Sequence, residues 1–145
     1  MAGELSITYR GVVYPHQCDH LGHMNVMYYV GKFDEATWQM FAGIGITPGY
    51  MRLQHCGVAA VHQVITYRRE LRAGDLLTVR TGILEINPKL IRFYHEMTND
   101  ETGDIAATTV ITGLHMDTQS RKACPFPAEI IQRAKEQIVE ITPVI

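Results

Sequence analysis

The chain has 145 residues, of which 46% are hydrophobic and 19% charged, and its formal net charge is −2. This length suits one domain with its own core, and the near-neutral charge gives no electrostatic reason to expect nucleic acid or an anionic membrane as a partner. No apolar run approaches the roughly 20 residues that span a bilayer, and the N-terminal sequence lacks the basic and apolar regions of a signal peptide. We therefore expect a single soluble, cytoplasmic domain over residues 1–145.

The three cysteines, Cys18, Cys56 and Cys124, are widely separated and form no C-x-x-C pair. This spacing argues against a disulfide framework and against a structural zinc site, and it suits a reducing cytoplasm. We expect each cysteine to be a small buried hydrophobe.

The first predicted element is a strand over residues 6–13, rich in Ile, Thr, Tyr and Val. A polar loop over 16–23 follows and leads into a helix that begins just after Asn25. Asn is a preferred N-cap residue, because its side-chain oxygen accepts a hydrogen bond from an otherwise unpaired backbone N–H. The helical spacing is carried by Val26, Val30, Phe33, Thr37 and Met40.

Glycine and proline residues mark the expected end of this helix after about four to five turns; they are Gly43, Gly45, Pro48 and Gly49. Four extended segments are then predicted, over residues 58–67, 76–86, 90–98 and 105–116. The third alternates cleanly, with one face made of Ile91, Phe93, His95 and Met97. A final helix is predicted over 127–140, with Pro127 at its start.

The order of elements predicts an α+β fold. Short connections favour antiparallel neighbours, so the sheet should have about five antiparallel strands. The single long helix can be buried only if this sheet curves around it. Open strand edges would then provide a natural place for dimer formation.

The densest group of reactive side chains lies in the loop before the helix and comprises His16, Cys18, Asp19, His20 and His23. The first N–H groups of a helix lack internal partners and carry partial positive charge, so a helix start can stabilise an oxyanion. A carboxylate just upstream is placed to attack a polarised carbonyl or to activate water against it. The residue types alone fit equally a turn role for Asp19, with local backbone hydrogen bonds.

The run from Cys18 to Tyr29, C-D-H-L-G-H-M-N-V-M-Y-Y, followed by F-D-E-A at 33–36, resembles the signature of the 4-hydroxybenzoyl-CoA thioesterase family. The likeness is greatest to the branch written D-x-x-G-H-M-N-x-x-x-Y, and it extends over nearly the whole chain because the order of elements also matches the hotdog fold. The resemblance implies hydrolysis of an acyl-CoA thioester to a free acid and CoA, without a cofactor or a metal.

The resemblance also implies roles for individual residues. Asp19 matches the catalytic carboxylate, which is a nucleophile or a general base depending on the member, and the backbone N–H of Val26 matches the oxyanion donor. Well-known family members carry Tyr near the helix start, where this chain has Val26, so the resemblance is not extended to an aromatic substrate. His23 would either orient Asp19 or line the pocket, or it would only form hydrogen bonds within the loop. Asn25 is either a cap or a substrate ligand, and Tyr29 is either core or pocket.

Basic residues matter because CoA carries phosphates. Lys89 and Arg92 flank a strand start where members of the family often place CoA-binding residues, and Arg68, Arg69 and Arg72 form a second group. Each could equally be a solvated charge at a strand end. The resemblance further implies sites at subunit interfaces, so we expect a homodimer or homotetramer whose sheet continues across two chains.

Three other interpretations compete. Imidazole and thiolate groups suit zinc, but Pro15 and Gly22 indicate a loop, in which the spacing of His16, His20 and His23 does not bring ligands together. A hotdog hydratase or dehydratase would place its acidic residue and histidine in other motifs. A non-catalytic acyl-CoA-binding module would share every binding feature. The sequence does not identify the acyl group.

Overall fold

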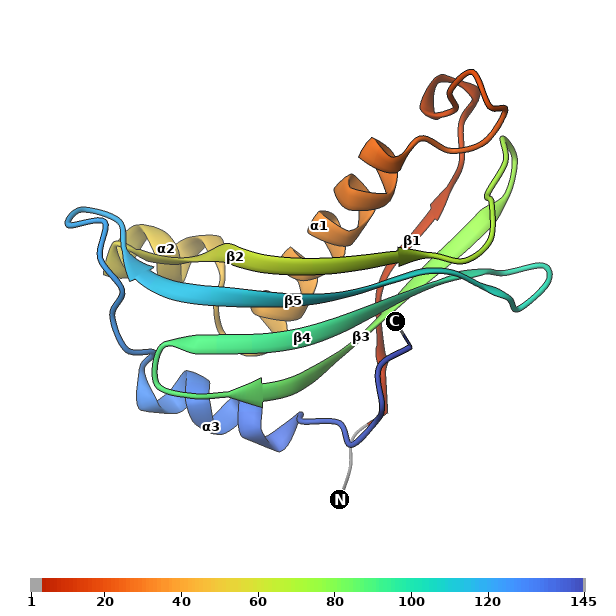
Figure 1. The fold of residues 1–145 in the computed structure, drawn as a ribbon. Coiled ribbons are helices and arrows are strands. Elements are labelled where there is room, and N and C mark those ends of the chain that lie inside the picture. Colours follow the sequence, from red (N-terminus) through yellow and green to blue (C-terminus); the bar gives the residue numbers. More distant parts are fainter. Residues whose placement is uncertain (1–3, 145) are drawn as a thin grey trace.

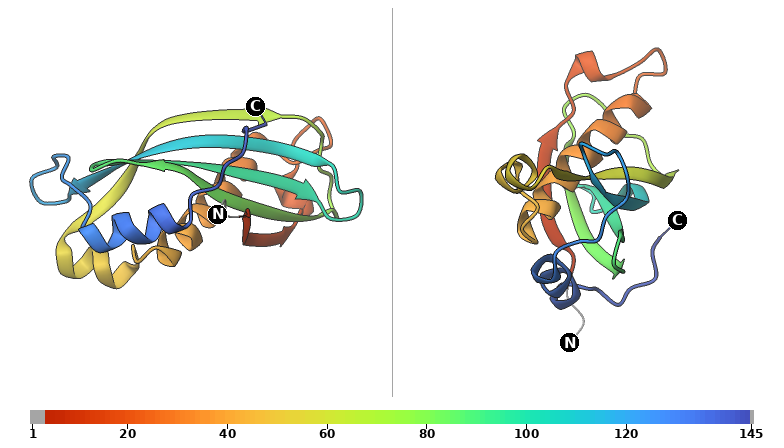
Figure 2. Two further views of the ribbon diagram at one scale, coloured as in Figure 1. Left: turned by 90° about the horizontal axis from the view of Figure 1, so that it is seen from below. Right: turned by 90° about the vertical axis from the view of Figure 1, so that its left-hand side faces the viewer.

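The computed structural model describes residues 4–144. Its antiparallel sheet has five strands in the order β1-β3-β4-β5-β2. The strands are β1 (Ser6–Val12), β2 (Cys56–Tyr67), β3 (Leu76–Ile86), β4 (Leu90–Asn99) and β5 (Ile105–Asp117), and the helices are α1 (Val26–Gly43), α2 (Pro48–Gln54) and α3 (Ala128–Glu136). The sheet curves across α1 (Figure 1), and the three helices lie on one side of it (Figure 2). The predicted α+β hotdog architecture is therefore confirmed.

The core lies between α1 and the concave face of the sheet. The predicted inward face of β4 supplies Ile91, Phe93, His95 and Met97, each of which is at most 1% exposed. Facing it, α1 buries a stripe of side chains made of Tyr29, Phe33, Ala36, Thr37, Met40 and Phe41. Burial of this apolar face holds the helix in the sheet and fixes where the helix begins.

His95 is a completely buried polar side chain in this core. Its Nε2 lies 2.7 Å from the hydroxyl of Thr37 on α1, and its Nδ1 lies 2.6 Å from the hydroxyl of Thr81 on β3. Complete burial lowers the pKa of His95 to about 3, so the ring is neutral at physiological pH. The two hydrogen bonds satisfy both ring nitrogens and link α1 to two strands.

Helix α2 was not predicted. Pro48 and Gly49 were interpreted as the end of the preceding helix, but Pro48 is the first residue of a separate short helix. The Thr47 hydroxyl caps that helix by accepting a hydrogen bond from the N–H of Tyr50 at 3.1 Å. Proline is well suited to this first position, where its missing N–H costs nothing.

Helix α3 ends at Glu136 rather than at residue 140. After it, Ile138 pairs with Ile83 of β3 in a parallel bridge, and the N–H of Val139 donates to the carbonyl of Ile83 at 2.9 Å. Sheet pairing thus replaces the last predicted turn of the helix. Within residues 4–144, no helix has the combination of length and apolarity needed to cross a bilayer.

The loop before α1 is fixed to one end of the sheet. The N–H of Val13 donates to the carbonyl of Asp75 at 2.9 Å, and the N–H of Met24 donates to the carbonyl of Leu71 at 2.7 Å. These bonds place the start of α1 beside the connection between β2 and β3. The reactive loop and this distant connection therefore form one surface.

Candidate active site

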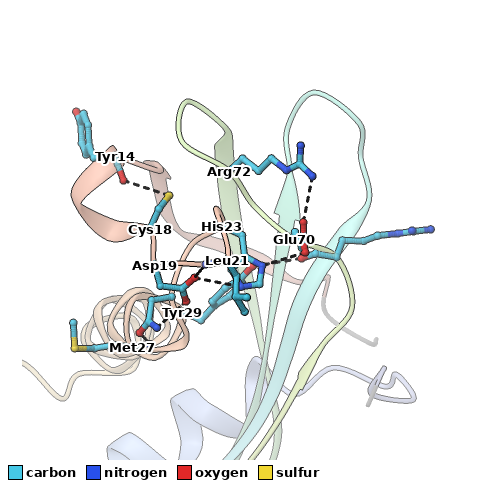
Figure 3. Close-up of polar contacts among 11 residues, drawn as sticks. Tyr14, Cys18, Asp19, Leu21, His23, Met27, Tyr29, Glu70 and Arg72 are labelled. Atoms are coloured by element: carbon cyan, nitrogen blue, oxygen red, sulfur yellow. Dashed lines mark hydrogen bonds and ion pairs between the residues drawn. The ribbon is translucent and has the colours of Figure 1, made fainter.

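The loop around Asp19 is closed by its own backbone. The N–H of Asp19 donates to the carbonyl of His23 at 3.0 Å, and the N–H of Gly22 donates to the carbonyl of Asp19 at 3.0 Å. Gly22 has φ of +81°, a conformation that side-chain-bearing residues rarely adopt. This tight turn directs the Asp19 carboxylate toward the start of α1 (Figure 3).

Both oxygens of the Asp19 carboxylate accept hydrogen bonds from within the chain. Oδ1 accepts a hydrogen bond from the backbone N–H of Leu21, and Oδ2 accepts one from Nδ2 of Asn25, each at 2.9 Å. The bond from Asn25, followed by that from Leu21, lowers the pKa of Asp19 below its ordinary value. The carboxylate is therefore ionised at neutral pH and fixed in orientation, yet accessible to a substrate.

Asn25 both caps α1 and bonds the Asp19 side chain. Its Oδ1 accepts the N–H of Met27 at 3.0 Å, which caps α1, while its Nδ2 donates to Asp19. Its backbone N–H donates to the carbonyl of Gln17 at 2.9 Å. The residue thus positions the carboxylate relative to the helix start. Its predicted contact with substrate remains a prediction.

The Val26 N–H is available to a ligand. Of the first three N–H groups in α1, that of Met27 bonds the Asn25 side chain and that of Tyr28 bonds the Asn25 carbonyl at 2.9 Å. In the part of the chain that the structure describes, the Val26 N–H donates no hydrogen bond. It is therefore a free donor at the positive end of the helix, beside a charged carboxylate.

Asp19 and Val26 line the same open pocket, which has a volume of about 440 Å³. Its walls come from the loop, from α1 and from the end of β2 with the segment that follows it. The lining residues are Asp19, Leu21, His23, Met24, Val26, Tyr29, Tyr67, Arg68, Arg69 and Glu70. The predicted catalytic group, the predicted oxyanion donor and His23 are thus brought together in one cavity.

Tyr29 forms a wall of this pocket. Its side chain is 4% exposed, its hydroxyl donates to the Arg69 carbonyl at 3.4 Å, and its ring meets that of Tyr67 edge-on at 5.1 Å. Burial raises the pKa of Tyr29 to about 12. The phenol is therefore neutral at physiological pH, and the residue shapes the pocket rather than exchanging protons.

His23 lies between two carboxylates, and sequence reasoning found only one of them. Its Nε2 is 3.7 Å from Oδ1 of Asp19, and its Nδ1 is 3.3 Å from Oε1 of Glu70 (Figure 3). The other Glu70 oxygen pairs with Arg72 at 3.4 Å. Glu70 belongs to no motif and lies far along the chain, so nothing local in the sequence connects it with the loop.

The predicted basic residues divide into two places. Arg68 and Arg69 are exposed at the pocket that contains Asp19. Lys89 lies in the turn between β3 and β4, and Arg92 pairs with Glu85 at 3.6 Å near the start of β4. The length of β4, ten residues or about 33 Å, separates this turn from the Asp19 end of the sheet. Within one chain, Lys89 and Arg92 are therefore not brought to the pocket.

The loop histidines do not assemble a metal site. His16 stacks on Tyr14 with ring centroids 5.9 Å apart, and His23 turns toward Glu70. Within residues 4–144, a single group of three or more His, Cys, Asp or Glu residues has its ligand atoms within 4.8 Å of one another, and no loop residue belongs to it. The zinc interpretation of the loop is therefore not supported by its geometry.

The chain is similar to known proteins over most of its length. The model of the thioesterase-like superfamily matches residues 13–134. The chain is 29% identical over 114 residues to the L-carnitine dehydrogenase/betainyl-CoA thioesterase of Agrobacterium fabrum, covering 79% of this chain and 23% of that protein. It thus spans about a quarter of the length of that relative. It is also 23% identical over 128 residues to the betainyl-CoA thioesterase of Pseudomonas aeruginosa, covering 88% and 80% of the two chains.

A solved structure shares the fold. A hypothetical protein from Staphylococcus aureus, characterised in complex with CoA, superposes with a TM-score of 0.88 at 20% identity. The superposition covers 98% of this chain and 90% of the other. The superfamily match includes the reactive loop, all of α1 and most of the sheet. The chain belongs to the thioesterase-like superfamily.

Proposed function

We propose that this protein hydrolyses an acyl-CoA thioester to a free acid and CoA, with Asp19 as the catalytic carboxylate. One observation carries the proposal: Asp19, whose carboxylate is ionised and oriented, lines one open pocket with Val26, whose backbone N–H has no partner in the described part of the chain. The thioester oxygen would accept the N–H of Val26, which stabilises the negative charge that develops on it. The names of the curated relatives give the same reaction class.

Two routes follow from this placement. Asp19 can attack the carbonyl carbon and form a mixed anhydride with release of the CoA thiolate, after which water hydrolyses the anhydride. Alternatively, it can take a proton from a water molecule that attacks directly. A general base works best with a pKa near the working pH, whereas a nucleophilic carboxylate needs only to be ionised. The lowered pKa of Asp19 therefore favours the nucleophilic route.

In a single-turnover experiment in oxygen-18-labelled water, label in Asp19 identifies the nucleophilic route. With enzyme in excess over substrate, the nucleophilic route places the label first in Asp19, provided that water attacks the Asp19 carbonyl of the anhydride. The general-base route places the label directly in the acid product. Mass spectrometry of the Asp19 peptide and of the product reads both outcomes.

The CoA moiety is anionic, and the exposed guanidinium groups of Arg68 and Arg69 supply positive charge at the pocket. We infer that they contact its phosphates. Lys89 and Arg92 remain candidates, but the strand length that separates them from Asp19 means that they can serve this pocket only from a second copy of the chain. Arg69→Ala should raise KM with little change in kcat, because it removes binding energy that substrate and transition state share.

The acyl group that we propose is small and cationic, as in betainyl-CoA. Two curated relatives carry that substrate in their names. The pocket offers the Glu70 carboxylate and the exposed ring of Tyr67, and carboxylates and aromatic faces both attract quaternary ammonium groups. The matched control substrate is tert-butylacetyl-CoA, in which a carbon atom replaces the cationic nitrogen at nearly constant shape.

The direct test is a thiol-release assay over a panel of short, branched, aromatic and cationic acyl-CoA esters, with chelator-treated protein. We expect hydrolysis without added metal and a higher kcat/KM for betainyl-CoA than for its neutral isostere. Glu70→Gln should reduce that preference. A panel with no hydrolysis but measurable acyl-CoA binding would indicate a binding module instead. Equal rates for the two isosteres would refute the cationic substrate and leave the thioesterase proposal standing.

We further propose that the protein forms a dimer through β2. The strand order places β2 at an edge of the sheet, and its 12 residues include no Asp, Glu, Lys, Arg or Pro. Such residues normally protect an edge against pairing with another chain. Val61, Val64 and Tyr67 of this strand are 40–55% exposed. Two β2 strands paired across a two-fold axis would continue the sheet and cover these side chains.

A further inference from the structure

A second group of reactive side chains lies at the end of the sheet opposite Asp19. Cys56 begins β2, His115 is near the end of β5, and Cys124 lies in the segment between β5 and α3. The two sulfur atoms are 4.0 Å apart, and the Cys124 sulfur is 3.4 Å from Nδ1 of His115. One ligand atom from each residue lies within 4.8 Å of the others. The proposed thioesterase mechanism uses none of the three.

We propose that Cys56, His115 and Cys124 form a zinc-binding site, with water as the fourth ligand. Zinc bonds sulfur at about 2.3 Å and imidazole nitrogen at about 2.05 Å in a tetrahedron, which sets the sulfurs about 3.8 Å apart and each sulfur about 3.5 Å from the nitrogen. The observed separations of 4.0 and 3.4 Å differ from these values by only a few tenths of an ångström. Zinc binding would need small shifts of the side chains and a rotation of the Cys124 carbonyl away from Nδ1 of His115.

Backbone pairing with β5 places the three side chains close together without a metal. Cys56 pairs with Asp117 on one side of β5, while the N–H of Cys124 donates to the His115 carbonyl at 3.0 Å on the other side. Residues 115 and 117 share a face of the strand because side chains alternate. Backbone hydrogen bonds therefore hold both cysteines beside His115. A preorganised site of this kind binds metal with little ordering cost.

The surroundings of His115 suit a metal ligand. The side chain is 1% exposed, and its Nε2 lies 2.9 Å from the hydroxyl of Tyr50. With zinc on Nδ1, the opposite N–H would donate to Tyr50, which is the second contact that metal-bound histidines usually make. Nδ1 also lies 2.9 Å from the Cys124 carbonyl, so zinc binding would require this nitrogen to give up that hydrogen bond and the carbonyl to turn away from it.

A disulfide fits the same residues less well. Cys56 and Cys124 lie on opposite sides of β5, and their sulfur atoms are 4.0 Å apart. A disulfide needs the two sulfurs about 2.05 Å apart. A direct bond would therefore have to close this gap, whereas a tetrahedral zinc ion fits a sulfur separation close to the one observed. The two cysteines are also 68 positions apart, which is why their spacing in the sequence gave no sign of a shared site.

The test uses tag-free, full-length protein, freed of metal and kept reduced with a phosphine. Zinc chloride is titrated by calorimetry into the wild type and into Cys56→Ser, Cys124→Ser and Cys18→Ser. Cys18→Ser is the matched control, because Cys18 lies in the Asp19 loop at the other end of the sheet. Cobalt titration of the wild type provides a second readout, since thiolate–cobalt bonds give charge-transfer absorption. Circular dichroism checks that each variant is folded.

We expect one zinc ion per chain for the wild type and for Cys18→Ser, with binding at least about a hundredfold weaker for Cys56→Ser and Cys124→Ser. Wild-type protein that takes up no zinc and shows no thiolate–cobalt absorption would overturn the proposal, as would unchanged affinity in Cys124→Ser. If that variant does not fold, the wild-type cobalt spectrum decides. A Cys56–Cys124 disulfide that forms readily in air even when zinc is present beforehand would identify a redox pair instead.

Discussion

Asn25 offers the sharpest perturbation of the site, because two substitutions separate its two roles. Asn25→Ser keeps an oxygen that can cap α1 at Met27, since Ser and Asn are equally good N-caps. It removes the Nδ2 donor that holds Oδ2 of Asp19 at 2.9 Å. Asn25→Ala removes both interactions. A comparison of the two variants therefore assigns the effect of each hydrogen bond.

The expected magnitudes follow from these contacts. A carboxylate released from one of its two anchors can shift by an ångström, and a misplacement of that size costs up to about a hundredfold in rate. We expect kcat to fall between about tenfold and a hundredfold in both variants. Loss of the cap in Asn25→Ala should further cost about 1 kcal/mol of folding stability, or about 2–4 °C in Tm for a chain of this length. Asn25→Ser should melt close to the wild type.

The assay pairs thiol-release kinetics with thermal unfolding of the same preparations. Wild-type kcat in Asn25→Ser would show that the bond to Asp19 does not position the reacting group. A wild-type Tm in Asn25→Ala would show that the helix cap contributes nothing to stability. Either result would refute the corresponding part of the argument without affecting the other.

Three further predictions concern other parts of the chain. His23→Ala should lower kcat by less than about tenfold, because the His23 ring lies 3.7 Å from the Asp19 carboxylate, farther than a hydrogen bond. A larger loss of kcat than in Asn25→Ser would make His23 the main positioning group. Val61→Lys should weaken the dimer in sedimentation analysis, since it places a charge on the exposed β2 edge. The control Leu53→Lys, at an exposed position of α2, should not weaken it. A dimer unaffected by Val61→Lys would rule out this interface. His95 keeps its folded-state pKa near 3 while the unfolded chain binds a proton below about 6.5. Its contribution to stability is therefore complete above pH 6.5 and is lost as the pH falls, at up to about 1.4 kcal/mol per pH unit. Denaturant unfolding between pH 6 and 5 should show this slope in the wild type and a flatter one in His95→Gln; equal slopes would contradict the assignment.

The parts of the fold that the sequence predicted are those set by local signals. The cap at Asn25, the helical spacing after it and the alternation through Phe93 and His95 are read over a few residues each, and the structure contains the corresponding helix and strand. The end of α3 was wrong because Ile138 pairs with Ile83, a contact between distant residues. Proline at 48 was ambiguous, since it can follow one helix or begin the next.

The same distinction applies to the site. Asp19, His23, Asn25 and Val26 lie within eight consecutive residues, so one motif was enough to group them. Glu70 joins them only because the connection between β2 and β3 packs beside the loop. The position of Lys89, at the end of the sheet opposite Asp19, likewise became visible only once the strand order and direction were known. Register and strand order are long-range properties, and short spacing patterns do not encode them.

The central claim, that Asp19 carries the chemistry, is tested most directly by Asp19→Asn. This change keeps the shape of the side chain but removes its charge, hence both the nucleophile and the base, and leaves one of its two hydrogen-bond donors without an acceptor. The measurement is kcat for acyl-CoA hydrolysis, with Kd for the same ester from calorimetry on the same preparation. We predict a fall in kcat of at least about a hundredfold, with Kd nearly unchanged and Tm within about 2 °C of the wild type, as for other surface positions. Near-wild-type turnover, or an unfolded protein, would show that Asp19 is a structural residue and would contradict the mechanism.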